Sequence, residues 1–228
     1  KERFHRIEEL GFDLRLFCEL RAGTSRAELE AMAAAGMREV QVGIESLSSG
    51  LLKKINKGTT AIDNLEIMKN CECRRLPDLN GNLILGFPSS NSEDVEETLQ
   101  NLDFAFPFRP LKGIALWLGY GSPLWRNPGR YGIRITGNHP DYRHLFPVEE
   151  FKGLRLMMLG YQGGIHEQRR IWKPVRKKLE EWRAFYNRIH REPGFEPVLS
   201  YRDGKRFMII RERRLNADTM THRLKGTS

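Results

Sequence analysis

Two segments place polar side chains directly after a short apolar strand, and this arrangement constrains the fold more than any other feature. In the first, Val40, Val42 and Ile44 alternate with small or polar residues and lead into Glu45-Ser46. The second, Asn82–Pro88, repeats the design further along the chain. Consecutive strands of this kind are typical of a β/α barrel that carries a ligand site at the carboxyl ends of its strands.

The rest of the pattern supports alternating strands and helices. Apolar runs predict strands at Asp13–Leu20, Glu39–Ile44, Asn82–Gly86 and Gly113–Leu118. Capping signals and helical apolar stripes predict helices between them: one that opens on a capping box of Ser25 and Glu28, others at Ser48–Asn56 and Thr60–Arg74, and one capped by Ser92. This alternation indicates parallel βαβ units. A long functional loop is expected over Gly119–Pro147, followed by a helix over Val148–Gly160.

The charge distribution predicts two parts. Residues 1–165 carry 21 Lys and Arg against 21 Asp and Glu, whereas residues 166–228 carry 17 against 8, so the net charge of +9 lies in the second part. Pro174 is expected in the first turn of a helix with a regular apolar stripe, and Asp203-Gly204 is expected at a hairpin turn. The second part therefore reads as a small basic α+β segment. Its charge fits a solvated helix face better than a nucleic-acid site.

Cysteine content and hydropathy indicate the compartment. Three cysteines cannot all pair, so reduced thiols in a cytoplasmic protein are expected. The spacing of Cys71 and Cys73 does not predict a metal site, because side chains two apart on a helix point about 200° apart. No apolar run approaches the ~20 residues of a membrane span.

Candidate binding residues follow from the strand ends. Glu19, Glu45 and Asn82 lie at predicted strand ends, where carboxylate and amide oxygens can accept hydrogen bonds from sugar hydroxyls. Lys57, twelve residues after Glu45, supplies a cation for a carboxylate or phosphate. A structural alternative remains open, in which Glu19 pairs with Arg21, Ser46 caps a helix and Lys57 is solvated.

The residues of these motifs, in this order, resemble those of one superfamily. Glu19-Leu20-Arg21, Val42–Leu47, Leu52–Gly58 and Asn82–Pro88 together resemble the later part of a radical S-adenosylmethionine (radical SAM) barrel. The segments near Gly121, Tyr131 and Tyr142 more narrowly resemble cobalamin-dependent radical SAM proteins that mature ribosomally made peptides. The resemblance covers about residues 1–165. It implies a partial (β/α)6-type barrel, with its last four strands present.

The resemblance also implies roles. Glu45 and Asn82 would hold the ribose of S-adenosylmethionine (SAM), and Lys57 would meet its methionine carboxylate. Glu19, Arg21 and Ser46 would complete the pocket. In the superfamily a reduced 4Fe-4S cluster cleaves SAM to a 5′-deoxyadenosyl radical, and the barrel positions and shields the reactants.

One signature of the superfamily has no counterpart in this chain. Cys18, Cys71 and Cys73 lack the Cys-x3-Cys-x2-Cys spacing that ligates the cluster. The first barrel strands and a cobalamin-binding domain also lack counterparts. We therefore expect the chain to be the carboxyl-terminal part of a longer enzyme, with the cluster and cobalamin implied for the full-length protein only.

The expected function is that of this parent enzyme: SAM-dependent modification, such as methylation, of a precursor peptide. Its partners would be that peptide and the missing amino-terminal portion. Two alternatives stay open. One is a non-catalytic barrel remnant that binds a peptide or nucleic acid, and the other is a cobalamin-independent radical SAM enzyme.

Overall fold

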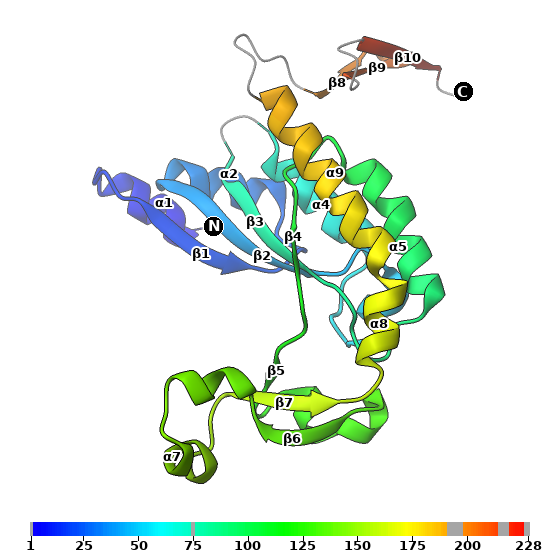
Figure 1. Cartoon of the computed structure of the whole chain (residues 1–228). Helices are drawn as coiled ribbons and strands as arrows, with labels where there is room; N and C mark the ends of the chain where they lie inside the picture. Colours follow the sequence, from blue (N-terminus) through cyan, green and yellow to red (C-terminus); the bar gives the residue numbers. More distant parts are fainter. Residues whose placement is uncertain (1, 74–75, 191–197, 214–218, 226–228) are drawn as a thin grey trace.

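A four-stranded parallel sheet forms the centre of the protein (Figure 1). The structure is a computed structural model that describes residues 2–73, 76–190, 198–213 and 219–225. The strands are parallel and adjacent in sequence order: β1 (Leu16–Leu20), β2 (Met37–Glu45), β3 (Asp78–Ile84) and β4 (Lys112–Ile114). Helical connections return the chain between consecutive strands, as parallel pairing requires.

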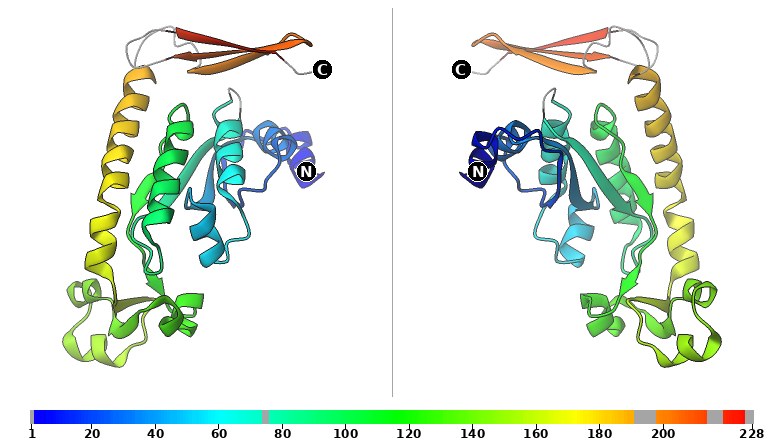
Figure 2. Two further views of the ribbon diagram at one scale, coloured as in Figure 1. Left: turned by 90° about the vertical axis from the view of Figure 1, so that its right-hand side faces the viewer. Right: turned by 90° about the vertical axis from the view of Figure 1, so that its left-hand side faces the viewer.

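Helices cover one face of this sheet. Contacts join α2 to β2, α4 to β3 and α9 to β4, and Figure 2 shows α4, α5 and α9 side by side. The helices of this part of the protein are α1 (Glu2–Glu9), α2 (Arg26–Ala34), α3 (Ser49–Lys54), α4 (Ala61–Cys71), α5 (Ser92–Ala105), α8 (Ile165–Ile171) and α9 (Lys173–His190). The predicted capping box of Ser25 and Glu28 opens α2.

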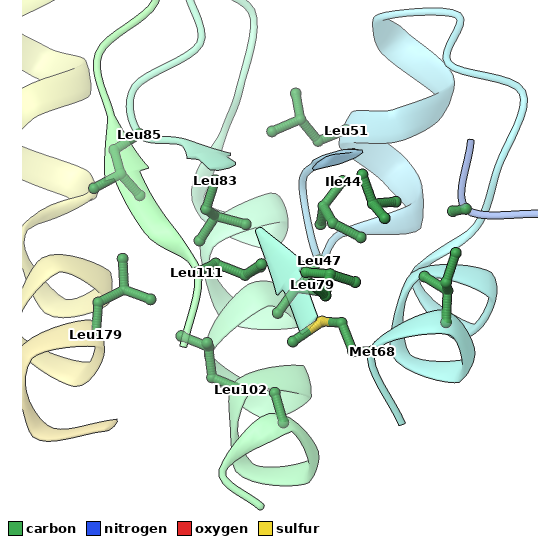
Figure 3. Close-up of a cluster of buried hydrophobic side chains, with 14 of the residues drawn as sticks. Ile44, Leu47, Leu51, Met68, Leu79, Leu83, Leu85, Leu102, Leu111 and Leu179 are labelled. Carbon is green, nitrogen blue, oxygen red and sulfur yellow. The ribbon is translucent and has the colours of Figure 1, made fainter. Parts of the chain in front are cut away.

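The main core lies between the sheet and these helices. Ile44 of β2 and Leu83 of β3 are fully buried, and Leu102 of α5 and Leu179 of α9 pack in the same cluster (Figure 3). Along β2 every second residue is buried from Val40 to Ile44, so the alternation predicted for this strand is confirmed. The intervening side chains face the side of the sheet without helices.

The stripe predicted in the basic segment forms α9. Trp182 is fully buried and Leu179 and Phe185 nearly so, while Tyr186 is half-buried. Pro174 lies in the first turn, as expected. This helix packs against α5 and β4. The division of the chain after residue 165 stays a prediction.

A second, antiparallel sheet lies beyond the carboxyl end of β4 (Figure 1). Its strand order is β5-β7-β6. It consists of β5 (Leu118–Gly119), β6 (Arg134–Asn138) and β7 (Met158–Gln162), with the short helices α6 (Pro123–Arg126), η1 (Pro128–Tyr131), η2 (Pro140–His144) and α7 (Val148–Gly153) between them. The segment 119–147, expected to be a loop, is therefore largely folded.

Two predictions in this region are wrong. The strand expected over Gly113–Leu118 is divided, because its first residues pair with β3 and Leu118 pairs with β7 of the other sheet. The helix expected over Val148–Gly160 ends at Gly153, and Met158 onward pairs with β5 and β6. In both cases pairing with a distant strand overrides the local pattern.

A third sheet follows α9, at the end of the molecule opposite the small sheet (Figures 1 and 2). It contains β8 (Leu199–Asp203), β9 (Phe207–Arg213) and β10 (Thr219–Lys225), in the order β10-β9-β8. The hairpin predicted around Asp203-Gly204 is confirmed, because β8 and β9 pair antiparallel on either side of it. The strand β10 had no counterpart among the predictions.

Several boundaries also differ from the expected ones. The strand predicted at Asn82–Gly86 begins at Asp78, because Asp78 to Gly81 pair with β2. Asn91 caps α5, whereas Ser92 was expected to. Asp94 lies at the third helical position counted from Asn91, so the two residues form a capping box. The side chain of each accepts a hydrogen bond from the backbone N–H of the other. The strand predicted from Asp13 begins at Leu16.

Candidate functional site

The carboxyl end of β2 has an unusual backbone. Glu45, the last residue of the strand, has φ +62°, a left-handed conformation that is uncommon outside glycine. One extra residue of β2 lies between the pairs Val42–Gly81 and Glu45–Leu83, which makes a bulge. A bulge next to a strand end re-aims the side chain that follows it. The Oε1 of Glu45 would lie 3.5 Å from a Cβ on Gly43, which faces away from the buried Val40, Val42 and Ile44.

A buried asparagine holds this strained turn. The Nδ2 of Asn64, on α4, donates to the carbonyl oxygen of Ile44 at 3.0 Å and to that of Ser46 at 2.7 Å. These two carbonyls flank Glu45, and Asn64 is fully buried. The amide therefore ties both sides of Glu45 to the helix that packs beneath it.

Helix α3 returns the chain to the same place. After its last residue, Asn56 adopts a left-handed conformation with φ +54°. The N–H of Asn56 donates to the carbonyl of Lys53, and the N–H of Lys57 donates to that of Leu52. This pair of bonds is the Schellman arrangement at a helix end. It fixes Lys57 as the first residue that leaves the helix.

Lys57 meets Glu45 above a glycine. The Nζ of Lys57 lies 3.1 Å from Oε1 of Glu45, and each side chain is 28% exposed. A Cβ on Gly43 would lie 2.7 Å from that Nζ, so the ammonium occupies space that a larger residue would take. Gly43 alternates with the buried Val42 and Ile44, which places the ion pair on the sheet face without helices.

Neighbouring strands add three further candidates. Glu19 of β1 is in register with Gln41 of β2, so the two share the face without helices. Asn82 lies on β3 between the buried Gly81 and Leu83, and it faces the same side. Arg21 is exposed just beyond β1. The side chains of Glu19, Arg21 and Asn82 form no hydrogen bond or ion pair with any described residue.

The structural alternative for these three contacts is not met. Glu19 and Arg21 form no ion pair within the described part of the chain. Ser48, not Ser46, caps α3, and Lys57 is half-buried and paired. Ser46 is 1% exposed, and its hydroxyl accepts a hydrogen bond from the N–H of Ser48 at 2.9 Å. The site thus brings Glu45 and Lys57 together, with Glu19 and Asn82 on adjacent strands and Ser46 beneath them.

Three residues that shape the site were missed from the sequence: Asn64, Asn56 and Gly43. Asn64 had a detectable signal, because it interrupts the apolar stripe of α4 that includes Ala61, Ile67 and Met68. A buried amide at such a position requires hydrogen-bond partners. The left-handed conformation of Asn56 and the space above Gly43 depend on the folded backbone.

The cysteines show no cluster geometry. Among the residues that the structure describes, no group of three or more His, Cys, Asp or Glu could hold a metal ion. Cys71 is buried, and burial raises the pKa of its thiol to about 12. The thiol is therefore protonated near neutral pH in this structure.

Comparison with known proteins identifies the family of this part of the chain. Residues 1–102, which contain β1 to β3 and the site, match the Radical SAM superfamily. Over these residues the chain is similar to the radical SAM superfamily. A curated relative, an uncharacterized methyltransferase of Pyrococcus horikoshii (PH0819), is 32% identical over 154 residues, which are 64% of this chain and 32% of the relative.

Solved radical SAM structures share the fold. One structure of TsrM from Kitasatospora setae, a radical S-adenosylmethionine methyltransferase with tryptophan substrate and a SAM analogue bound, matches 79% of this chain and 40% of that protein, at 18% identity and a TM-score of 0.53. A second, with cobalamin and a 4Fe-4S cluster bound, matches 79% and 39% at 16% identity and a TM-score of 0.52. The predicted α/β radical SAM fold is confirmed.

The chain is much shorter than the proteins that it matches. It spans about a third of the curated relative and about two fifths of the TsrM chains. In the part of the protein that the structure describes, no helix has the length and apolar character needed to cross a membrane.

Proposed function

We propose that the carboxyl end of β2 binds SAM, and that the protein takes part in radical SAM methylation of a peptide. The observation that carries the proposal is the Glu45–Lys57 ion pair, held by strained backbone on the sheet face without helices. Strained residues persist where the surrounding structure enforces them, and they cluster at ligand sites. The superfamily match over residues 1–102 supports the same assignment.

The residue types at the site fit the groups of SAM. Lys57 and Arg21 would bind the methionine carboxylate, because a cation and a carboxylate form charge-assisted hydrogen bonds. Glu45 and Asn82 would accept hydrogen bonds from the ribose hydroxyls, and Glu19 would face the methionine amino group. Ser46 would contribute by closing the pocket floor, since its hydroxyl is already bonded.

When bound, SAM supplies the methyl group for transfer. The protein's own contribution is to orient the ligand. The partly buried Glu45–Lys57 pair offers one acceptor and one donor in a fixed arrangement, so the ligand does not have to order them. Each side chain keeps 28% of its surface exposed, which leaves both accessible to a ligand.

The 4Fe-4S cluster does not fit the described residues, and we assign none of them to it. We propose that its cysteines, and the site for cobalamin, belong to an amino-terminal portion outside these 228 residues. The chain covers only 32% of the curated relative and 40% of the TsrM chain, and this supports the proposal. A cobalamin-independent enzyme would need the cysteines from that portion but not the cobalamin site.

Equilibrium dialysis of the chain against radiolabelled SAM tests the binding proposal. Lys57→Ala should weaken SAM binding by about 1.5–3 kcal/mol, because it removes a hydrogen bond to a charged group. Lys53→Ala is the matched control, since Lys53 lies on α3, the helix that precedes Lys57, is exposed, and forms no ion pair with a described residue.

Equal affinity for SAM in the Lys57→Ala variant and the unaltered chain would remove Lys57 from the site. A chain that binds no SAM but binds a peptide would instead favour the alternative of a non-catalytic barrel remnant.

A further inference from the structure

A cavity of about 420 Å³ lies between the main sheet and the small sheet, separate from the Glu45–Lys57 site. Its walls come from the residues that follow β3 and β4, from β6 and β7, and from helices α8 and α9. Volumes of this size are typical of small-ligand and short-peptide sites. None of the SAM-site candidates lines it.

Two arginines give this cavity its charge. Arg169 of α8 and Arg176 of α9 both line it, and no acidic side chain of the described residues does. Neither guanidinium forms a hydrogen bond or ion pair with a described residue. A third lining residue, His139, has Asp141 at 3.4 Å as its own partner. The two guanidiniums are therefore the uncompensated positive groups of the cavity.

The adjacent cations on the same helices behave differently. Arg170 binds Glu167 at 2.6 Å, and Lys177 lies 3.7 Å from Glu181. Neither lines the cavity. Glu167 and Glu181 thus pair with these two cations and not with the two arginines that line the cavity.

The remaining walls are apolar or neutral. Trp117 is 71% exposed, an unusual fraction for a tryptophan, and it lines the cavity with Leu116 and Ile165. Burial raises the pKa of the Tyr161 phenol, against an opposing effect of Arg169. The phenol is therefore neutral near pH 7 and can donate a hydrogen bond.

We propose that this cavity binds a carboxylate-bearing ligand with an apolar portion, and specifically an acidic segment of a peptide. Arg169 and Arg176 would each bind a carboxylate, since the guanidinium fork matches two carboxylate oxygens. Trp117 would contact an apolar side chain between the two acidic groups. The inference does not depend on SAM binding, because the two sites share no residue.

Isothermal titration of the chain with an acetylated, amidated Asp-Leu-Glu peptide tests the proposal. Saturable binding is expected, with an affinity that falls about tenfold or more in each of Arg169→Gln and Arg176→Gln, because each substitution removes a charge-assisted hydrogen bond. Arg170→Gln and Lys177→Gln remove the same charge outside the cavity and should change the affinity less than about twofold.

Three further titrations decide the ligand. The Asn-Leu-Gln peptide should not bind, because it lacks carboxylates. Glutarate should bind more weakly than Asp-Leu-Glu, since it lacks the apolar side chain. Equal losses in cavity and control variants, or inorganic phosphate binding in place of the peptide, would overturn the proposal. All four arginine and lysine positions are exposed, so thermal melting should show that every variant folds.

Discussion

Glu45 holds a left-handed backbone conformation that costs about 1–3 kcal/mol for a residue with a side chain. The surrounding structure offsets this cost through Asn64, which binds the carbonyls before and after Glu45. Asn64 therefore acts on the site as a positioning residue, since it does not face the ligand pocket. Its effect on ligand binding should pass through the geometry of Glu45.

We expect Asn64→Ala to lower the free energy of unfolding by about 1–3 kcal/mol, because it removes two buried hydrogen bonds, to the carbonyls of Ile44 and Ser46. It should also weaken SAM binding. Urea denaturation and dialysis measure the two effects. Glu66→Ala, an exposed position on the same helix, is the control. A free energy of unfolding equal to that of the control would contradict the role of Asn64 in holding the turn at Glu45.

At the scale of elements, helix α3 is held at both ends. At its start, Glu97 of α5 accepts hydrogen bonds from the Ser48 hydroxyl and from the backbone N–H groups of Ser49 and Gly50. At its end, the left-handed Asn56 completes the Schellman arrangement that releases Lys57. The position of Lys57 therefore depends on contacts at both ends of a six-residue helix.

The Glu97 contacts predict a pH dependence. Burial acts to raise the pKa of Glu97, but the hydrogen bonds from Ser48, Ser49 and Gly50 outweigh it and lower the pKa below its ordinary value. A carboxylate whose pKa is lower in the folded state stabilises the protein at pH values above its unfolded-state pKa. This stability is lost as the pH falls through its folded-state pKa.

Urea unfolding from neutral pH down to about pH 3 should therefore show a smaller acid-dependent loss in Glu97→Gln than in the unaltered chain. The neighbouring Glu96→Gln removes an exposed carboxylate and should leave the profile unchanged. Identical profiles for the two variants would show that Glu97 does not anchor α3.

The left-handed residue Asn56 is needed to end α3. Asn56→Val should destabilise the fold by about 1–3 kcal/mol, because a β-branched residue is strained at positive φ. It should also weaken SAM binding through displacement of Lys57. Asn56→Gly should be tolerated, since glycine adopts the left-handed conformation readily. Equal unfolding midpoints for the two variants would contradict the assignment.

Some elements are determined by residues close in sequence, and others by residues far away in the chain. The capping box at Ser25 and the stripe of α9 were predictable, because both follow from neighbours in sequence. The division of β4 from β5 and the identity of β7 were not, because each depends on a strand distant in the chain. At the site, the residue types at strand ends were predictable. The bulge before Glu45 and the clamp by Asn64 required the folded backbone.

At the scale of the whole molecule, α9 belongs to the main core, although its charge resembles that of the segment after it. Its Val175, Leu179 and Trp182, with Trp172 just before it, are almost fully buried in the cluster that includes β2 and β3. Burying side chains of this size contributes about 1.5–3 kcal/mol each. Their sum is comparable with the total stability of a typical domain.

Truncation tests this view of the molecule. A chain that ends at residue 190 lacks the third sheet and should keep a cooperative thermal transition, because the described residues after 190 contribute only Val198 to the buried residues. A chain that ends at residue 171 lacks α9 and should lose the transition. Circular dichroism melting measures both. Cooperative melting of the shorter chain would show that the sheet and remaining helices fold without α9.

The four tryptophans differ in burial, so intrinsic tryptophan fluorescence can distinguish changes in different parts of the protein. Trp172 and Trp182 are fully enclosed, Trp125 is partly covered, and Trp117 is mostly open to water. Acrylamide should therefore quench mainly the long-wavelength emission of Trp117, while the enclosed pair emits at shorter wavelengths. A loss of quenching at constant short-wavelength emission would report an event beside β4. A shift of the short-wavelength emission would report opening of the core.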